Sequence, residues 1–408
     1  MSHLATHVTP QDYAAPPAIA RWGSRALTVG VLFSVLAVAG AIWKWDLFLR
    51  AWLFGFLFWM GPTLGSLVLI MLQYTSGGNW GRLGRRFWEA AAGNLPLMFA
   101  CWLPIAIGMK ALYLWASMPR DQAVKEFGQK IELYLNPTGF WIRGIAFFFA
   151  WWLFYRYLMR WSKKEEAGET SPAQFVSVQN LSGFGIVFYA WTITFASIDW
   201  AMSLDPGWWS TVWGMLFMVG EVLTAFCLTI MLLVKLAPME PLSQMFKIDY
   251  LHDFGKFMLT FVVLWAYLSF SQWLIIWSGN IVPEIRWYLM RLRGGWQFFG
   301  TALIFVHFVF PFALLLSRNL KRDGARLIKI AMLVIVMRLV DLFWQTAPAF
   351  YPAGDLSRMG WLDVAMYIVC PIAIGGIWLF LFSNRLGKRS IMPVNDPHFV
   401  EMLEAKHG

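Results

Sequence analysis

Charged side chains interrupt several long apolar stretches of this sequence. A charged group at the centre of a bilayer costs about 2.5–3.5 kcal/mol on insertion scales. Such residues are expected to face the interior of a helix bundle, where they have either a partner or a task such as proton transfer. The residues of this kind are Asp199, Glu221, Arg338 and Asp341.

Glu221 is the deepest of the four, about 13 residues into an apolar run that begins near residue 208. At about 1.5 Å per residue it would lie roughly 20 Å from the start of its helix. Two interpretations fit this position. Burial can raise the pKa of a carboxyl group until it exchanges protons at the working pH, or a neutral Glu221 can hydrogen-bond a neighbouring helix.

Asp199 and Asp341 each precede a proline by seven residues, near the ends of their apolar runs. Arg338 lies three residues before Asp341 on the same helix face, which predicts an ion pair. Asp199 has no such neighbour in its own helix. Asp205, in the Asp-Pro-Gly turn that follows, could transfer protons or simply cap the next helix.

Histidines extend the set of candidate proton carriers. His252, Asp253 and Lys256 share one face at the start of an apolar run and could collect protons, although a solvated helix start has the same composition. His307 lies within another run, where a neutral, hydrogen-bonded core histidine is the alternative. Together these nine residues predict a polar file from His252 and Asp253, past Glu221 and His307, to Asp199 or Asp341.

Redox cofactors and metals are not expected in this chain. Haem b needs two facing histidines within the membrane, and only His307 is deep. Cys101, Cys227 and Cys370 stand singly in apolar runs, without the paired spacing of iron–sulfur, zinc or covalent haem sites. The three thiols are expected to pack as small buried hydrophobes.

The elements that must position these residues are membrane helices. Of the 408 residues 59% are hydrophobic and only 14% charged, whereas soluble domains carry roughly 25% charged residues. A crossing helix needs about 20 apolar residues. Ten such spans are predicted, at 26–43, 47–72, 91–115, 138–159, 181–203, 208–234, 255–278, 295–317, 326–346 and 361–383. Ala37 lies in a cleavage-like tripeptide, but the long polar segment before it favours an uncleaved helix.

Basic residues predict the orientation. With ten spans, the termini and the even-numbered loops carry 21 Lys and Arg, against 11 in the odd-numbered loops. Positive residues accumulate on the cytoplasmic side. Both termini are therefore predicted to be cytoplasmic, and the net charge of +10 is attributed to membrane anchoring rather than to nucleic acid.

Two motifs recur in the same order. Gly-x-Leu-Phe-x-x-Gly-x-x-Leu begins at Gly55 and again at Gly214, and the Asp199–Pro206 spacing returns at Asp341–Pro348. The repeated helices run in the same direction, so the repeat is parallel. We expect an all-α membrane protein with two four-helix bundles, 47–203 and 204–346. Flanking helices would occupy 26–46 and 347–383, and cytoplasmic tails 1–25 and 384–408.

Specific segments resemble a known family. Asp199-Trp-Ala-Met-Ser-Leu-Asp205-Pro-Gly-Trp-Trp-Ser-Thr resembles the turn between helices 5 and 6 of the NrfD-like membrane subunits of bacterial alternative complex III. Leu251-His-Asp-Phe-Gly-Lys and Phe270-Ser-Gln-Trp-Leu-Ile-Ile-Trp-Ser-Gly-Asn, followed by Pro283-Glu284, are similar to the smaller of these subunits, the ActF family. The resemblance covers about 180 residues.

The resemblance implies a place in a quinol:cytochrome c oxidoreductase of the bacterial inner membrane. Its expected partners are the larger quinol-binding subunit (ActC), haem c subunits and an iron–sulfur subunit. Members of the ActF family are expected to carry a proton path and no metal. Residues 47–115 here contain no membrane His or Asp that could accept a quinol proton, so this chain is not expected to bind the complex's quinol.

Two alternatives remain open. The chain could be the quinol-binding anchor of another NrfD-type oxidoreductase. A secondary transporter is disfavoured, because an inverted repeat and broken midplane helices are both missing.

Overall fold

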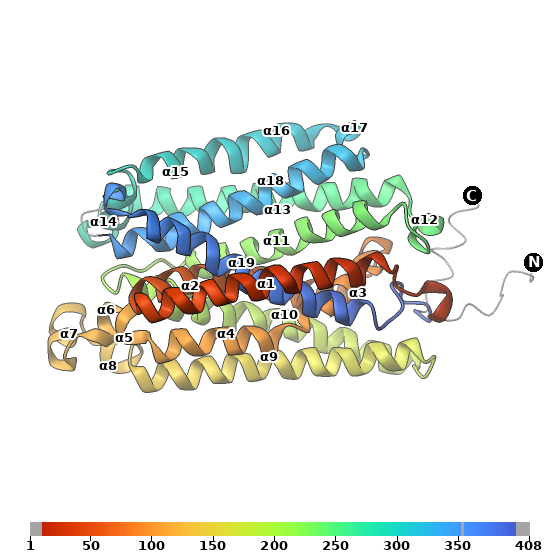
Figure 1. The fold of residues 1–408 in the computed structure, drawn as a ribbon, viewed down its shortest axis with the longest axis horizontal. Helices are drawn as coiled ribbons and strands as arrows, with labels where there is room; N and C mark the ends of the chain where they lie inside the picture. The colour runs from red at the N-terminus through yellow and green to blue at the C-terminus, as the bar shows by residue number, and fades with distance from the viewer. Residues whose placement is uncertain (1–9, 352–354, 397–408) are drawn as a thin grey trace, which may run out of the picture.

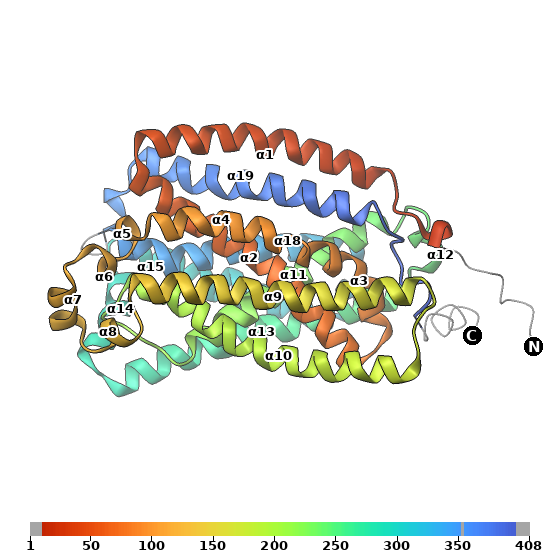
Figure 2. The ribbon, with the colours of Figure 1, turned by 90° about the horizontal axis from the view of Figure 1, so that it is seen from below.

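The computed structural model describes residues 10–351 and 355–396, and this part of the chain is helical apart from its turns. The long helices run side by side along the long axis of the molecule (Figure 1). Short helices gather at its two ends. We call the end with α12 and α17 the terminal end, and the end with α5–α8 and α14 the distal end (Figures 1 and 2).

The helices and their bounds, in chain order, are η1 (Pro10–Tyr13), α1 (Ala18–Trp43), α2 (Trp45–Ser76), α3 (Asn79–Ala92), α4 (Leu95–Ile107), α5 (Met109–Leu112), α6 (Leu114–Ser117), α7 (Arg120–Phe127), α8 (Lys130–Leu133), α9 (Pro137–Glu166), α10 (Pro172–Trp200), η2 (Met202–Leu204), α11 (Trp213–Leu236), α12 (Leu242–Met245), α13 (Ile248–Gly279), α14 (Val282–Arg291), α15 (Trp296–Ala302), the π-helix η3 (Leu303–Val309), α16 (Phe310–Leu316), α17 (Arg318–Lys321), α18 (Gly324–Thr346), η4 (Ala347–Phe350), η6 (Leu356–Arg358) and α19 (Trp361–Leu386).

Membrane-spanning character is confirmed for most of the predicted spans. Among the described residues, seven helices are long and apolar enough to cross a bilayer, or eight if the bent pair α3–α4 forms one span. Helices α9 and α18 coincide with the other two predicted spans, but charged residues lower their hydropathy. The count of ten spans stays a prediction.

The two ends of the described chain meet at the terminal end. The backbone N–H of Ile391 donates to the carbonyl of Tyr13 at 2.8 Å, and Ala14 pairs with Ser390 in an isolated β-bridge. The number of crossings between them must therefore be even. The outermost residues of the predicted tails, 1–9 and 397–408, lie outside the described residues.

Helices α1, α10 and α13 begin before the predicted spans 26–43, 181–203 and 255–278, and two further spans differ more in form. The third, 91–115, is split by a bend of 41° between α3 and α4. At about 1.5 Å per residue, α4 alone is only about 20 Å long, so it needs its neighbours to cross. The sixth begins at Trp213 rather than 208, because residues 205–212 form a loop. Glu221 consequently lies about 12 Å from the start of α11, not 20 Å.

Helix α2 lies at the centre of the helix bundle. Of its most apolar stretch 94% is buried, and it packs against α3, α4, α10, α11 and α19. Glycines permit the closest approaches. A Cβ atom at Gly55 would lie 3.0–3.3 Å from the backbone of Cys370 and Pro371 in α19, and one at Gly65 would overlap the backbone of Glu221 in α11.

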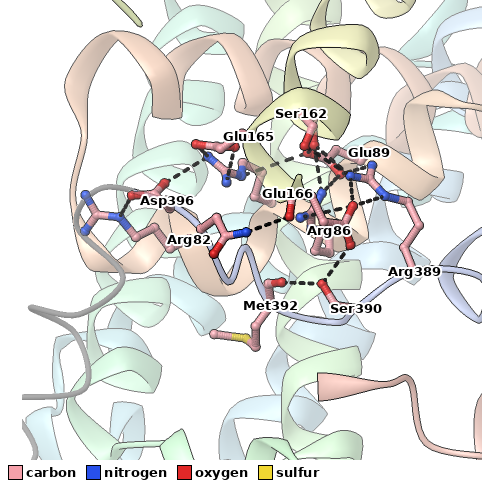
Figure 3. A network of polar contacts seen from close by, with 12 residues as sticks. Arg82, Arg86, Glu89, Ser162, Glu165, Glu166, Arg389, Ser390, Met392 and Asp396 are labelled. Atoms are coloured by element: carbon pink, nitrogen blue, oxygen red, sulfur yellow. Dashed lines mark hydrogen bonds and ion pairs between the residues drawn. The ribbon is translucent and has the colours of Figure 1, made fainter. Parts of the chain in front are cut away.

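A buried ion network fastens the segment after α19 to the terminal end (Figure 3). Arg85 of α3 pairs with Glu165 of α9 at 2.7 Å and with Asp396 at 3.0 Å. Arg389 pairs with Glu89 at 2.9 Å. Removing one member of a buried pair leaves an uncompensated charge, so this network locks the position of residues 388–396.

Helix α1 lies along α19 at the side of the bundle (Figure 2). Small residues recur every seven positions on the buried side of α1, at Gly23, Gly30 and Ala37. A Cβ atom at Gly30 would come within 2.7–2.9 Å of the backbone of Gly376 and Ile377. Small residues let membrane helices approach closely enough for dispersion contacts to hold them together.

We therefore predict that Gly30→Ala destabilises the protein by about 1–3 kcal/mol, because the added methyl overpacks a backbone contact. Gly183→Ala in α10 is the matched control, since nothing lies within 4 Å of its Cβ position. Thermal unfolding of the detergent-solubilised chain, followed by Trp fluorescence, measures both. Equal melting temperatures for the two variants would disprove the close α1–α19 contact.

Candidate functional site

The centre of the candidate site is the pair formed by Arg338 and Asp341 of α18. The pair predicted from their spacing is confirmed, and both side chains are buried. The Asp341 carboxylate also accepts a hydrogen bond from Trp265 Nε1 of α13 at 2.9 Å and from Gln345 Nε2 at 2.9 Å. Three side chains from two helices therefore hold the Asp341 carboxylate.

Glu221 approaches this pair from α11. Its carboxyl group accepts a hydrogen bond from the hydroxyl of Tyr189 in α10. A Cβ atom at the neighbouring Gly220 would collide with the guanidinium of Arg338. Glycine at this position thus lets the arginine lie directly against α11, one residue from Glu221.

His307 completes the cluster from the π-helical segment η3. The side chain is fully buried, and its ring meets Trp265 edge-on with 4.3 Å between ring centroids. Neither ring nitrogen has a hydrogen-bond partner in the described structure. The two interpretations of His307, a proton carrier or a neutral core histidine, both stay predictions. Single π turns inside α-helices are frequent at functional sites.

An aromatic cavity of about 540 Å³ adjoins the cluster. Asp341 and Trp265 are among the residues that line it. Phe270, Trp273 and Ile304 also line it, and their side chains are exposed on the outer surface of the bundle. The cavity is therefore positioned to open between α13 and η3, where an apolar molecule could enter from lipid.

Polar groups line the distal side of the cavity. Ser210 donates to Gln272 Oε1 at 2.8 Å, and Gln272 Nε2 donates to the Tyr288 hydroxyl at 3.3 Å. Buried Arg291 braces this wall by donating to the carbonyls of Trp344 and Gln345 at 3.0 and 2.7 Å. An apolar cavity with a few placed polar groups is the usual form of a small-molecule site.

Asp199 lies apart from the cluster, at the distal end of α10. Arg143 of α9 donates to both carboxylate oxygens at 2.8 Å. The guanidinium also stacks over the ring of Tyr134 at 3.8 Å. This bidentate pair satisfies the charge of Asp199.

Asp205 does not cap the following helix, so that alternative was wrong. Helix α11 begins eight residues later and has no side-chain cap. Asp205 instead ends η2 in the distal loop, where the carbonyl of Asp205 accepts from the N–H of Trp208 at 3.0 Å. Burial lowers the pKa of Lys130 in α8, and the nearby Asp205 carboxylate opposes that shift.

His252, Asp253 and Lys256 lie at the terminal end of α13, as predicted. Lys256 pairs with Asp253 at 3.1 Å, and both side chains are about half exposed. Aromatic rings separate them from Glu221. Phe226 of α11 stacks on Phe257 of α13 at 5.4 Å and 10°, and Trp80 of α3 meets Phe257 at 4.5 Å.

The structure thus brings four of the nine predicted residues together, namely Glu221, His307, Arg338 and Asp341. The other five lie at the two ends. The sequence interpretation missed the partners Tyr189, Trp265, Gln345 and Arg143. Only Arg143 carried a signal, as a charge inside the predicted span 138–159.

No group of three or more His, Cys, Asp or Glu side chains that could hold a metal ion occurs among residues 10–351 and 355–396. No protein-family model and no curated protein matches the chain.

We predict that Asp341→Ala destabilises the protein by about 3–5 kcal/mol, because it leaves Arg338 buried without its counter-charge. Asp341→Asn is the matched control, since it retains an acceptor for Trp265. The double variant Arg338→Met/Asp341→Leu should recover most of the loss. Unfolding in mixed micelles with increasing SDS measures all three. A double variant no more stable than Asp341→Ala would show that the two charges are not coupled.

Proposed function

We propose that this chain is a membrane subunit of an alternative complex III-type quinol:electron-acceptor oxidoreductase and carries protons through the buried cluster around Glu221. The observation that supports this proposal most is that Glu221, His307 and Asp341 are buried in one part of the helix bundle. Neither imidazole nitrogen of His307 has a protein hydrogen-bond partner among the described residues. Proton transfer needs exchangeable groups within hydrogen-bond reach or one water apart. The identity of the complex comes from the family resemblance, which covers about 180 residues of the sequence.

In this proposal the proton path has a polar half and an aromatic half. From the cluster toward the distal end, protons pass along the polar wall of the cavity, at Gln272 and Tyr288. Toward the terminal end, the rings of Phe226 and Phe257 lie between Glu221 and the group at His252 and Asp253. Protons entering there must pass this aromatic layer with bound water, so the layer is the proposed point of control.

The predicted pair of parallel bundles belongs to the same proposal. The repeated glycines all lie at close contacts: Gly55 faces α19 and Gly61 faces α11, whereas Gly214 faces α10 and Gly220 faces Arg338 of α18. These neighbours are not equivalent helices, so the duplicated arrangement of α2–α10 and α11–α18 is supported by the sequence repeat alone.

The aromatic cavity favours a second candidate, a quinol-binding anchor of an NrfD-type oxidoreductase. A quinol ring is flat and apolar, with two hydroxyl groups that need partners. The cavity offers aromatic walls, the Gln272 amide and the Asp341 carboxylate, and Asp341 could accept a quinol proton. The missing acceptor in residues 47–115 does not bear on this cavity, because the second half of the chain forms it.

The proton path is tested by Glu221→Gln, which keeps the volume and a hydrogen-bonding amide but removes proton exchange. We predict normal assembly and quinol oxidation but fewer protons moved per electron in sealed vesicles. Haem c absorbance of the purified complex reports assembly. Glu126→Gln, on an exposed carboxyl of α7, is the control and should leave the ratio unchanged.

An unchanged ratio in Glu221→Gln would assign Glu221 a structural role and disprove the path. Collapse of quinol oxidation itself, with assembly intact, would favour the quinol-binding candidate. Isolation of the chain as a cofactor-free homo-oligomer, without haem c subunits, would contradict the proposed complex.

Cytoplasmic placement of the terminal end is a further part of the proposal. We predict that Lys388→Cys is labelled by a membrane-impermeant maleimide only from the cytoplasm, and Arg120→Cys only from the periplasm. Both positions are exposed at opposite ends, and the three native cysteines are buried, so the background is low. Labelling with the reverse sidedness would overturn the orientation.

A further inference from the structure

A pocket at the terminal end concentrates positive charge. It has a volume of about 520 Å³ and lies where the end of α3, the last turns of α9 and the segment after α19 meet. Its basic residues are Arg86, Arg156, Arg160, Lys163, Arg385, Lys388 and Arg389, against two acidic residues, Glu89 and Glu166.

The two carboxylates are already neutralised. Arg389 pairs with both Glu89 and Glu166, and Arg86 pairs with Glu89 at 2.8 Å (Figure 3). Burial acts to lower the pKa of Arg389, but these two carboxylates raise it above the ordinary value, so Arg389 stays charged. The inner wall of the pocket is thus a fixed, closed set of ion pairs.

The outer wall carries unneutralised charge. Among the described residues, no carboxylate pairs with any of four exposed basic side chains. They are Arg156, Arg160 and Lys163, spaced along one stretch of α9, and Lys388 across the pocket. Arg385, beside them, donates only to the side chain of Asn94. A ligand that fits this wall must therefore be anionic.

An apolar groove continues from the pocket along the same helix. Leu95, Pro96 and Phe99 of α4 face Ile145, Phe148, Phe149 and Trp152 of α9, and they enclose about 260 Å³. Trp152 of the groove and Tyr155 of the pocket are three residues apart, or about 4.5 Å along the helix. From Arg160 to Ile145 the distance along α9 is about 22 Å, close to one leaflet with its headgroups.

We propose that the pocket and groove together bind one anionic phospholipid, with its phosphate among Arg156, Arg160, Lys163 and Lys388 and an acyl chain between α4 and α9. The continuity of a basic pocket with a groove on the lipid-facing side selects a lipid over a soluble anion. Basic pockets between membrane helices on the cytoplasmic side recognise anionic headgroups. The bound lipid would contact α3, α9 and the segment after α19 on the outer side of the pocket, and Arg389 links the same three segments by ion pairs on the inner side. This site does not depend on the proposed proton path or complex, and its cytoplasmic side rests on the orientation given under the proposed function.

The test compares charge removal inside and outside the pocket. The triple variant Arg156→Gln/Arg160→Gln/Lys163→Gln is matched by Lys164→Gln/Arg318→Gln/Lys329→Gln, which removes three exposed charges from the same end without touching the pocket. Each full-length protein is exchanged into nanodiscs of zwitterionic lipid with increasing phosphatidylglycerol. Retained phospholipid is then quantified by mass spectrometry after detergent extraction and washing.

We expect the wild type and the control to retain phosphatidylglycerol, and the pocket variant to bind it about a hundredfold more weakly. Ile145→Trp, which fills the groove at an exposed position, should weaken lipid retention without removing charge. Melting temperatures in zwitterionic lipid verify that every variant is folded. If both triple variants lose phosphatidylglycerol retention equally, the lipid is held by nonspecific surface attraction and the proposed site is wrong. If inorganic phosphate alone stabilises the protein and Ile145→Trp has no effect, the ligand is a free anion and the lipid site is wrong. Binding of an acidic protein segment in the pocket would also refute the lipid site.

Discussion

The close contact between α2 and α11 is the constraint on which the rest of the structure depends. Gly61 and Gly65 remove the side chains that would keep the two helices apart, so the backbone of α2 meets that of α11 at Glu221. Because α2 also contacts α3, α4, α10 and α19, this seam joins the first half of the chain to the second. It also excludes lipid from Glu221, which a looser contact would leave facing the bilayer.

Much of this architecture could be predicted from the sequence, because burial in a membrane demands long apolar runs. Eight of the ten predicted spans each coincide with one long helix, and the third and eighth are divided among shorter helices. The Arg338–Asp341 pair follows from spacing along one helix. Contacts between helices could not be predicted. Tyr189 reaches Glu221 from another helix, and Arg143 reaches Asp199 in the same way. Spacing within one helix carries no information on such partners. The helix start at Trp213 was missed because the apolar residues of the preceding loop resemble a helix end. The start at Asn79 was missed because α3 is rich in charged residues and does not resemble a membrane span.

The two halves of the chain handle buried charge differently. In the first half, Arg143 and Asp199 form a closed bidentate pair, and the terminal network around Arg85 is likewise satisfied by carboxylates. Pairs of this kind hold helices in place, because breaking one leaves an unpaired charge in a medium of low dielectric constant. They are poorly suited to proton transfer, since both carboxylate oxygens are held by a guanidinium, which does not release its proton. At Asp341 the guanidinium of Arg338 binds only one carboxylate oxygen, and the other accepts from Gln345.

Buried polar atoms without a protein hydrogen-bond partner occur in both halves, for example at Tyr74 and Arg86 in the first. In the second half they include both ring nitrogens of His307, and Oε1 of Gln345 and Nε1 of Trp344, two residues that line the aromatic cavity. An unsatisfied buried polar atom costs about 1–3 kcal/mol. The proposed function gives His307, beside Asp341 and Glu221, a task that needs exchangeable protons. The chemistry of the chain is therefore expected in α11–α18, while α2–α10 and the terminal network hold that half in the membrane.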